Sequence, residues 1–426
     1  MQYISIIKAE IESTSPLFIS DGEDILLDEE SGMAYIPATT IAGSFRGYLD
    51  FIGEESDVLF GSSGEKSIKS SVYISDSYSK NEGFEIRNGI KIEGITGSSE
   101  DGSKIERFYL KKAIRFTLNF EIEGQDKDIE TKRHLLYKCL QGLNNSFIRL
   151  GGNKSNGLGI FKVNRVKEIN FNNRKQWVDY IKKDYSNIQD ITDRVLNENK
   201  NDKFVEFTLN GVLTTPILVG APETFDPEDV DKRSLKSGDN YIIPGSSFKG
   251  VLRSRIECIG NYFNSIRLAK EIFGDLSKEN MLSRVFVNES IINIENFDQI
   301  DYNRIKVDKF TGGVRKTGLM DDGPVQGAVE FKVIYKTQND EEKDSYAIGI
   351  IALALRDLGT ENLSLGGGYS IGRGRYKGHS MIITIGDEKI KVDFRNKTVT
   401  NEEKLDDYIK SVKTFRYEEG ENEEKI

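Results

Sequence analysis

Hydrophobic and polar residues follow two kinds of spacing along this chain, and the spacing predicts where strands and helices form. Alternating apolar residues predict half-buried strands over residues 3–12 and 204–213. Each of these strands is followed by further segments in the same order. They are short helices from Ser44 and Ser247, strands at 85–93, 113–122, 303–308 and 328–336, helices at 131–143 and 345–357, and last strands at 158–165 and 375–385. Each half of the chain is therefore predicted to run strand, helix, two strands, helix, strand.

Five short sequences occur in both halves in the same order, which indicates a duplicated domain. The separation of equivalent residues grows only from 200 at Pro16 and Pro216 to 215 at Gly151 and Gly366. The paired sequences are 14–19 with 214–219, 35–47 with 241–250, 60–61 with 273–274, 90–97 with 305–312, and 150–152 with 365–367. Chance supplies one such match, but hardly five in order.

The element order and the duplication together predict an α+β chain of two tandem ferredoxin-like domains, an RRM-like arrangement. We expect the first domain at residues 1–168 and the second at 204–393. Residues 169–203 are polar and rich in lysine and asparagine, with one amphipathic stretch, and are interpreted as a linker or lid. Residues 394–426 end in acidic low complexity and are expected to form a solvated tail.

The composition narrows the function classes. The 426 residues include 59 basic and 69 acidic side chains, a net charge of −10, so nucleic-acid binding would need a local basic patch. Neither an apolar run of about 18 residues nor a signal peptide is visible, so we expect no membrane association. Two cysteines exclude a disulfide scaffold and a four-cysteine zinc site, and they fit a cytoplasmic protein. Two histidines exclude chemistry that needs several.

Small hydroxyl residues and cations recur at the predicted start of the first helix in each half. Free backbone N–H groups and the helix dipole favour an anion there, so we predict that these residues contact phosphate. Plain N-capping by serine or threonine is the alternative for each position taken alone. The residues are Thr39, Thr40, Ser44 and Arg46 in the first half, and Ser246, Ser247, Lys249 and Arg253 in the second.

A glycine-rich loop precedes the last strand in each half. Glycines allow the backbone to approach a ligand and expose its amides. Lys154 supplies a cation to the first loop and Arg373 and Arg375 supply two to the second, where Tyr369 could stack on a base. Neither loop has the spacing of a Walker A loop or a dinucleotide fingerprint. A tight turn between helix and strand is the alternative interpretation.

Taken together, these features resemble the RAMP superfamily of CRISPR proteins. The resemblance rests on the α+β unit, the Pro-Gly-Ser-Ser-Phe-Lys-Gly turn at 244–250, the Val-Asp-Lys-Phe-Thr-Gly segment at 307–312 and the glycine loop at 366–374. Within the superfamily, the chain is most similar to backbone subunits of type III (Csm/Cmr-like) effector complexes. The match covers most of residues 1–390, and it is closer in the second half because residues 38–43 read Ala-Thr-Thr-Ile-Ala-Gly. A tandem fusion of two such domains resembles type III-D or III-E arrangements.

The resemblance implies a role in antiviral defense. Backbone subunits line up along a CRISPR guide RNA and hold its phosphates through the helix turn and the glycine loop. A hairpin thumb kinks the guide–target duplex, and residues 91–116 and 306–333 would contain the two thumbs. Base pairing with a target single-stranded RNA would set sequence choice, while the protein reads backbone and shape. The implied partners are guide RNA, target RNA and other subunits of a type III effector complex.

The resemblance also implies that the chain is a hydrolase, a metal-dependent RNA endonuclease. Active backbone subunits need an aspartate in the loop before the proline turn. Asp231 stands thirteen residues before Pro244, with Asp229 as the alternative, and Asp24 stands thirteen residues before Pro37. At Asp231 or Asp24 a carboxylate would hold Mg²⁺, or another divalent cation, at the scissile phosphate. Solvated loop acids are the alternative, and the second domain is the favoured nuclease because some backbone domains do not cut.

Three other functions compete. A non-catalytic guide-RNA scaffold would share every binding feature and lack only the role of the loop aspartates. A guide-processing endonuclease of the same superfamily usually has a histidine near the first helix, and neither His134 nor His379 lies there. An adhesin with duplicated β-rich domains would explain the repeat and the acidity, but not the cations at helix starts and glycine loops.

Overall fold

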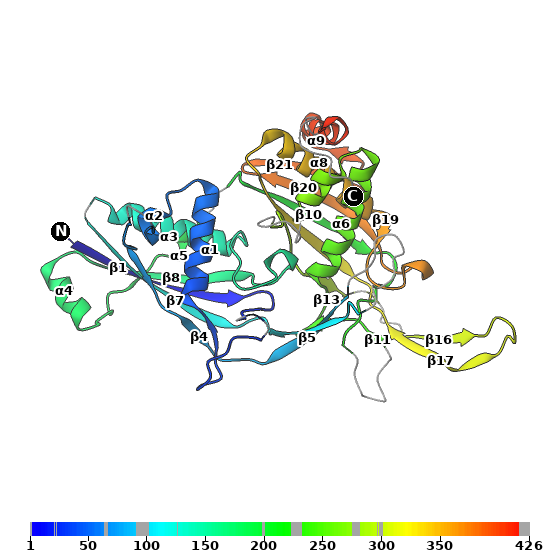
Figure 1. The fold of residues 1–426 in the computed structure, drawn as a ribbon, viewed down its shortest axis with the longest axis horizontal. Coiled ribbons are helices and arrows are strands. Elements are labelled where there is room, and N and C mark those ends of the chain that lie inside the picture. Colours follow the sequence, from blue (N-terminus) through cyan, green and yellow to red (C-terminus); the bar gives the residue numbers. More distant parts are fainter. Residues whose placement is uncertain are drawn as a thin grey trace. The chain divides into compact units, whose positions relative to one another are not determined.

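The computed structural model describes residues 2–416 except 21, 23, 64–66, 91–101, 126, 198–200, 223–231, 275–281, 296 and 298–300. The chain is α+β and divides into two compact units (Figure 1). Unit 1 comprises Met1–Glu85, Phe108–Lys154 and Leu158–Asn201, and unit 2 comprises Ile86–Arg107, Ser155–Gly157 and Asp202–Ile426. Within the described part of the chain, every helix is too short or too polar to cross a bilayer.

In the first repeat the central strand is β1, which lies between β7 and β8. The sheet order is β3-β7-β1-β8-β9 with antiparallel neighbours. Ile7, Ala9 and Ile11 are buried at alternate positions of β1, as its pattern predicts. The elements are β1 (Gln2–Ser13), β2 (Ala34–Ile36), α1 (Ala38–Ile52), α2 (Asp57–Phe60), β3 (Val72–Ile74), β4 (Ser77–Ser79), β5 (Phe84–Gly89), β6 (Ile105–Leu110), β7 (Arg115–Gln125), α3 (Ile129–Asn144), the 3-10 turn η1 (Lys154–Asn156), β8 (Phe161–Phe171), α4 (Arg174–Ile181), β9 (Gln189–Asp190) and α5 (Thr192–Leu196).

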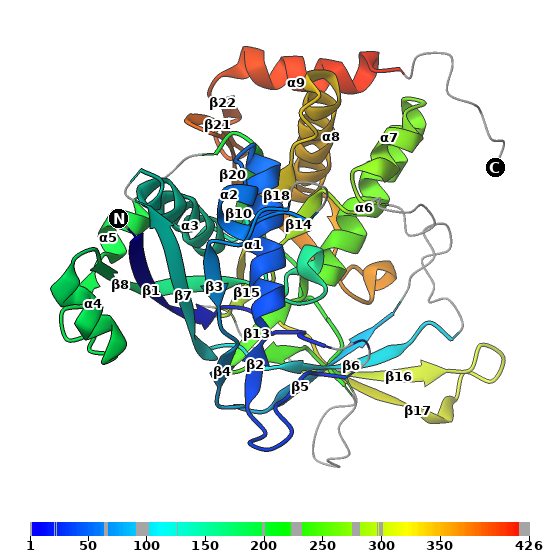
Figure 2. The same ribbon diagram turned by 60° about the vertical axis from the view of Figure 1, so that its left-hand side comes forward.

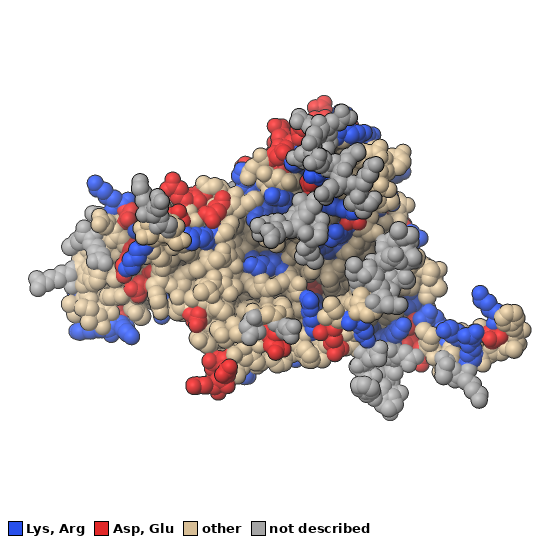
Figure 3. All heavy atoms as spheres, in the orientation of Figure 1, with Lys and Arg blue, Asp and Glu red and all other residues tan. Residues whose placement is uncertain are grey.

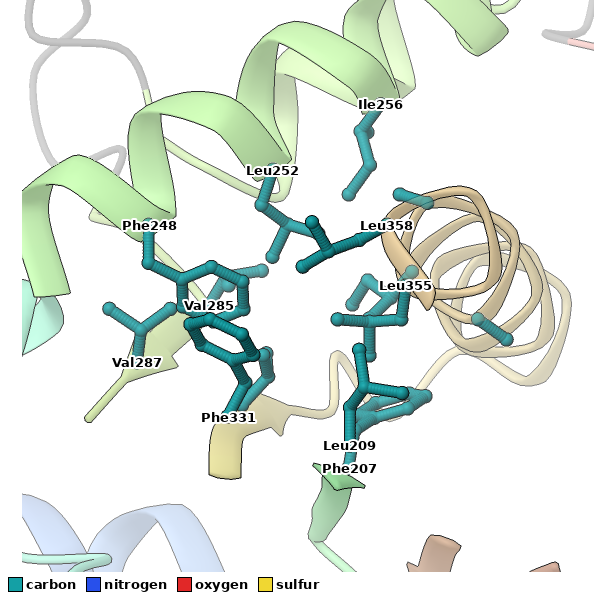
Figure 4. Packing of buried hydrophobic residues seen from close by; sticks show 14 of the residues in the cluster. Phe207, Leu209, Phe248, Leu252, Ile256, Val285, Val287, Phe331, Leu355 and Leu358 are labelled. Atoms are coloured by element: carbon teal, nitrogen blue, oxygen red, sulfur yellow. The ribbon is translucent and has the colours of Figure 1, made fainter. Parts of the chain in front are cut away.

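The second repeat has the same central order, β14-β18-β10-β20. Helices α6 and α8 pack on this sheet, and the ring of Phe248 on α6 stacks on Phe331 of β18 with 4.5 Å between centroids (Figure 4). The elements are β10 (Phe204–Leu213), β11 (Lys232–Arg233), β12 (Lys236–Ser237), β13 (Asn240–Ile243), α6 (Gly245–Tyr262), α7 (Ile266–Glu271), β14 (Val285–Val287), β15 (Ser290–Asn293), β16 (Tyr302–Val307), β17 (Val314–Gly323), β18 (Ala328–Lys336), α8 (Glu341–Gly359), β19 (Thr360–Ser364), the 3-10 turn η2 (Tyr369–Ile371), β20 (Arg375–Ile385), β21 (Glu388–Asp393), β22 (Thr398–Val399) and α9 (Glu402–Thr414).

The prediction for the second strand of each sheet was wrong. The described part of segment 85–93 falls in the hairpin β5–β6 and segment 303–308 in the hairpin β16–β17, and both hairpins belong to small sheets separate from the main ones. The second strand of each main sheet is instead β3 or β14, and each has only three residues. Three residues are too few to show alternation, so the longer hairpin strands gave the stronger pattern.

The described part of the segment interpreted as a linker or lid, 169–203, carries regular structure, and the segment belongs to unit 1 up to residue 201. It contains the end of β8 together with α4, β9 and α5. The amphipathic stretch forms α4, and its aromatic face covers one end of the sheet. The contacting residues are Trp177, Tyr180, Tyr185 and Ile188, against Ile4, Ile6, Ile169 and Phe171.

The prediction of a solvated tail from residue 394 was wrong as far as residue 416. These residues include β22 and α9, and α9 lies across α8 (Figure 2). Leu405 and Val412 of α9 are buried, and they lie two helical turns apart on one face of the helix. At Gly349 of α8, a side-chain Cβ would lie 2.0 Å from the backbone oxygen of Tyr408, so glycine permits the close approach. The acidic residues 417–426 lie outside the described residues.

Glu168 on β8 is the acceptor of a buried polar network in unit 1. Its carboxylate accepts hydrogen bonds from Arg133 Nε at 2.7 Å, the Tyr137 hydroxyl at 2.8 Å and the Ser5 hydroxyl at 3.1 Å. Burial alone would raise the pKa of Glu168, but the hydrogen bonds and charge of Arg133 outweigh it and hold that pKa below its usual value. The side chains of Arg133 and Glu168 are only 7% and 3% exposed, so the pair joins α3 to the sheet away from water.

We expect Glu168→Gln to lower the free energy of unfolding at pH 7 by about 3 kcal/mol, because Arg133 then stays buried without its carboxylate. The folded-state pKa of Glu168 lies below the ordinary 4.5, so the pair stabilises the fold above that pH and is lost as the pH falls toward the folded-state pKa. The difference between variant and wild type should therefore shrink in acid.

Urea unfolding at neutral pH and near about pH 3.5 measures this difference. Glu130→Gln is the matched control, because Glu130 also pairs with Arg133 but its side chain is 67% exposed. It should cost less than about 1 kcal/mol. An undiminished difference for Glu168→Gln in acid would contradict the assignment.

Candidate nucleic-acid interface

The first helix of each repeat begins directly after a proline, at Ala38 in α1 and at Gly245 in α6. The helix start predicted at Ser44 was therefore wrong by six residues. Proline lacks an N–H and fixes its own backbone angle, so it can precede a helix at little cost. Ser44 consequently lies in the second turn of α1 and not at its N-terminus.

The hydroxyl residues of the first helical turn are free of capping roles. Neither α1 nor α6 has a side-chain cap hydrogen bond. Thr39 and Ser246, which are equivalent, are both exposed, and Thr40 and Ser247 are both half-buried. The capping alternative does not apply, and both repeats present the same pair of hydroxyl groups beside a helix N-terminus.

The N-terminus of α1 already has an anionic partner. The backbone N–H of Ala38 donates to Asp76 Oδ1 at 2.7 Å, from the turn between β3 and β4. This carboxylate takes the position that a phosphate would favour at a helix start. Sequence reasoning missed Asp76, because nothing in the pattern links it to a helix 38 residues earlier.

Arg46 and Arg253 are equivalent, since each stands eight residues after the first residue of its helix. Both reach the Phe-Gly sequence of their own repeat and not a helix N-terminus. Arg46 donates to the Gly61 carbonyl and pairs with Asp57 at 2.8 Å, while the Arg253 guanidinium lies 5.9 Å from the centre of the Phe273 ring.

The Thr-x-Pro sequences and the glycine loops recur together because they hydrogen-bond to each other. The N–H of Gly159 donates to the Pro16 carbonyl at 3.1 Å, and Gly374 donates to Pro216 at 3.0 Å. A second bond in each repeat runs from Gly152 to Phe18 at 2.6 Å and from Gly367 to Leu218 at 2.8 Å. The same clamp thus fixes both loops.

Two loop glycines are required by the backbone itself. Gly159 and Gly374 have φ of 71° and 74°. A Cβ at these positions would lie 2.0 Å and 1.8 Å from the carbonyl oxygens of Leu150 and Leu365. For these glycines the tight-turn interpretation is correct, whatever the rest of the loop binds.

In the first repeat the glycine loop and the first helix meet. Lys154 Nζ lies 3.5 Å from the Ser44 hydroxyl of α1. Lys154 is half-buried, and burial lowers its pKa. No carboxylate among the described residues pairs with this ammonium group. The structure therefore brings two of the predicted site residues together, the partly desolvated cation of Lys154 and the hydroxyl group of Ser44.

In the second repeat each predicted cation has an intramolecular partner. Sequence spacing could not reveal these partners, because most are distant along the chain. The pairs are Lys249 Nζ with the Ser283 hydroxyl at 2.9 Å, Arg253 with Glu257 at 2.7 Å, Arg373 with Asp322 at 2.9 Å, and Arg375 with the Glu361 carbonyl. Tyr369, by contrast, is 56% exposed on η2.

Asp322 joins the glycine loop of the second repeat to the base of the hairpin β16–β17. Its side chain is fully buried, and one carboxylate oxygen accepts from both Arg373 and Arg304. The Arg373 guanidinium also lies 5.3 Å from the centre of the Tyr302 ring. Lys232, which follows Asp231 in the sequence, pairs with Asp322 in the β11–β17 ladder.

The hairpin β16–β17 projects from the rest of unit 2 and carries lysine and arginine side chains (Figures 1 and 3). At its turn Asp308 accepts from the N–H groups of Phe310 and Thr311, at 3.0 and 3.1 Å, and these backbone hydrogen bonds lower its pKa. The Val-Asp-Lys-Phe-Thr-Gly segment is therefore a hairpin turn. Exposed apolar residues share the hairpin with the cations: Ile305, Val307, Phe310, Val314 and Leu319.

The proposed catalytic aspartates are only partly described. Asp229 and Asp231 lie outside the described residues, and Asp24 is exposed. Nearby Asp28 is held in a turn by Ser31, whose hydrogen bonds lower the pKa of its carboxyl group. The described residues form no group of three or more side chains that could hold a metal ion.

Comparison with known proteins agrees with the repeated architecture. A sequence model of the RAMP superfamily matches residues 10–162 and 212–377. Each matched range begins in the central strand of one repeat and ends in the strand after its glycine loop. No curated protein matches the chain. Because the two ranges cover most of the chain and coincide with its two repeats, the chain belongs to the RAMP superfamily.

Proposed function

We propose that this protein is a CRISPR-associated RNA-binding subunit and, more specifically, a backbone subunit of a type III effector complex. In this proposal each repeat is a ferredoxin-like unit that holds guide RNA at the edge where its first helix and glycine loop meet. The superfamily supplies the CRISPR association. The contacts of individual residues support the location and chemistry of the RNA site.

The observation that carries the proposal is the meeting of Lys154 and Ser44. An ammonium group that is half-buried, has a lowered pKa and pairs with no carboxylate among the described residues is poorly compensated in the free protein. A backbone phosphate would compensate the charge of the ammonium group and accept a hydrogen bond from the adjacent hydroxyl group. The exposed Thr39 on the same helix would extend the contact along the strand.

The second repeat would use different groups for the same task. Ser246 and Ser247 remain accessible, and the ion pair of Arg253 is a partly exposed i,i+4 contact with Glu257. Such pairs are worth less than about 1 kcal/mol, so a phosphate can compete for the arginine. Tyr369 offers an exposed ring for base stacking. The hairpin β16–β17 would act as the thumb that contacts the guide–target duplex.

The sheet face is a poor alternative RNA surface in unit 1. The aromatic side chains of its central strands, Phe116, Phe120, Phe161 and Phe171, are at most 2% exposed. Exposed positions of β1 are occupied by ion pairs, Glu12 with Arg115 at 2.8 Å and Glu10 with Lys167 at 3.4 Å. RRM-type recognition needs exposed aromatics on the sheet, so binding at the helix–loop edge is favoured.

We also propose target cleavage by the second repeat. Asp231 would act at the scissile phosphate, with Asp24 as its counterpart in the first repeat. Mg²⁺ bound by such an aspartate and by phosphate oxygens would neutralise charge and orient the 2′-hydroxyl. The remaining residues would hold guide and target in register. A purely structural scaffold is the competing function.

We expect Lys154→Ala to weaken binding of single-stranded guide RNA by about tenfold at low salt, because a charge-assisted phosphate contact is lost. The slope of log K against log salt should fall by about 0.7. Fluorescence anisotropy over a KCl series measures both. Lys80→Ala is the matched control, since Lys80 is 84% exposed and faces Glu82 at 3.6 Å. If the Lys154 and Lys80 variants bind guide RNA with equal affinity, the proposed phosphate site is not at this loop.

We expect Asp231→Ala to retain guide and target binding but to lose one cleavage product, because only the catalytic group is removed. Asp229→Ala is its control, and Asp24→Ala tests the first repeat in the same way. Products are compared on sequencing gels with the assembled complex and Mg²⁺. If every variant gives every product, the chain is a scaffold and not a nuclease.

A further inference from the structure

Unit 2 contains a socket that is filled by a turn of the first repeat. The socket consists of Gly245, the first residue of α6, and residues 287–289 between β14 and β15. The filling segment, 155–157, belongs to unit 2 although it comes from the first glycine loop. A Cβ on Gly245 would lie 2.2 Å from the carbonyl oxygen of Asn156, and one on Gly157 would lie 2.9 Å from the backbone nitrogen of Glu289. The fit therefore depends on glycine at both contact points.

A buried ion pair closes the same socket. Glu289 pairs with Arg87 of β5, and their side chains are only 8% and 10% exposed. Arg87, like the filling segment, belongs to unit 2 although it comes from the first repeat. A glycine-lined approach together with a desolvated pair is typical of a specific interface and not of a loose surface contact.

The turn of the second repeat that is equivalent to this plug is uncovered. Residues 369–372 correspond to 154–157, because both follow the repeated Leu-Gly-Gly sequence at the same distance. Tyr369 and Ile371 are each 56% exposed. A Cβ on Gly372 would meet nothing within 4 Å, whereas its counterpart Gly157 is tightly packed. In the described part of the chain, no socket like that around Gly245 receives the η2 turn.

The equivalent positions in the first repeat, by contrast, carry residues that leave no room for a plug. Ala38 occupies the place of Gly245, and Asp76 occupies the place of Glu289 in the turn after β3. The methyl group of alanine fills the space that a plug carbonyl would need. Asp76 also uses its carboxylate within the repeat, on the N–H of Ala38 at 2.7 Å. A groove of about 280 Å³ remains beside Ala38, Thr39 and Ile74, and the alanine methyl group and the bound Asp76 carboxylate stand at the helix start itself.

We propose that the η2 turn docks into the socket of a separate RAMP-type unit whose first helix starts with glycine. Because the first socket of this chain is closed, no further unit can dock there, and the chain forms one end of such an assembly. A plug that differs from its socket makes a heterologous contact, and such contacts propagate into open assemblies unless one end is blocked. Ala38 and Asp76 supply the block. The inference does not depend on RNA binding, and its test uses protein free of RNA.

The test is to open the first socket. The double variant Ala38→Gly, Asp76→Glu recreates the residues of the second socket, so one molecule can accept the η2 turn of another. Sedimentation velocity over a range of concentrations should show wild type as a monomer and the variant as dimers and longer species. Adding Ile371→Arg should return the variant to a monomer. Adding Ile181→Arg, which changes a 76% exposed residue of α4, should not.

Two results would overturn the proposal. Wild type that associates and is dispersed by Ile371→Arg would show that the first socket is open. A folded double variant that stays monomeric at every concentration would show that the turn and the socket do not fit. Should the double variant fail to fold, as judged by its melting curve, Ala38→Gly alone carries the same two readouts, since it changes only the first helical residue.

Discussion

The hydrogen bonds between the Thr-x-Pro segment and the glycine loop are the constraint on which each candidate site depends. They are made by backbone groups, so they fix the course of the loop regardless of which side chains it carries. Held in this way, the loop crosses the end of the central strand, and in the first repeat its lysine reaches the first helix. Duplication copied the clamp intact, and the side chains then diverged around it.

That divergence gives the two repeats different electrostatics on one scaffold. In the first, Lys154 pairs with no carboxylate in the described part of the chain, and the helix N-terminus is occupied by Asp76. In the second, the helix start carries glycine and Arg373 is engaged by a buried carboxylate. A chain with a negative net charge can thus still have cationic groups at particular positions, and the net charge does not predict the local charge at either site.

The duplication, the central strands and the four longest of the described helices, α1, α3, α6 and α8, were predictable, because long periodic segments and repeated landmarks are local signals. The hairpins were mistaken for sheet strands because β3 and β14 are too short to show a period. Helix α9 was missed because its four buried or half-buried apolar positions lie between charged residues. Partners such as Asp76, Asp322 and Glu361 could not be foreseen. Each depends on a contact made through tertiary packing, which leaves no trace in spacing along the chain.

The burial of Asp322 has a mechanical consequence. A carboxylate that is shielded from water and shared by two arginines cannot lose one of them cheaply, since the remaining charge would have no solvent to compensate it. Tilting the hairpin would pull on Arg304, and displacing the glycine loop would pull on Arg373. The hairpin and the glycine loop are therefore tied to one buried carboxylate, so neither can move its arginine away without breaking a hydrogen bond to Asp322.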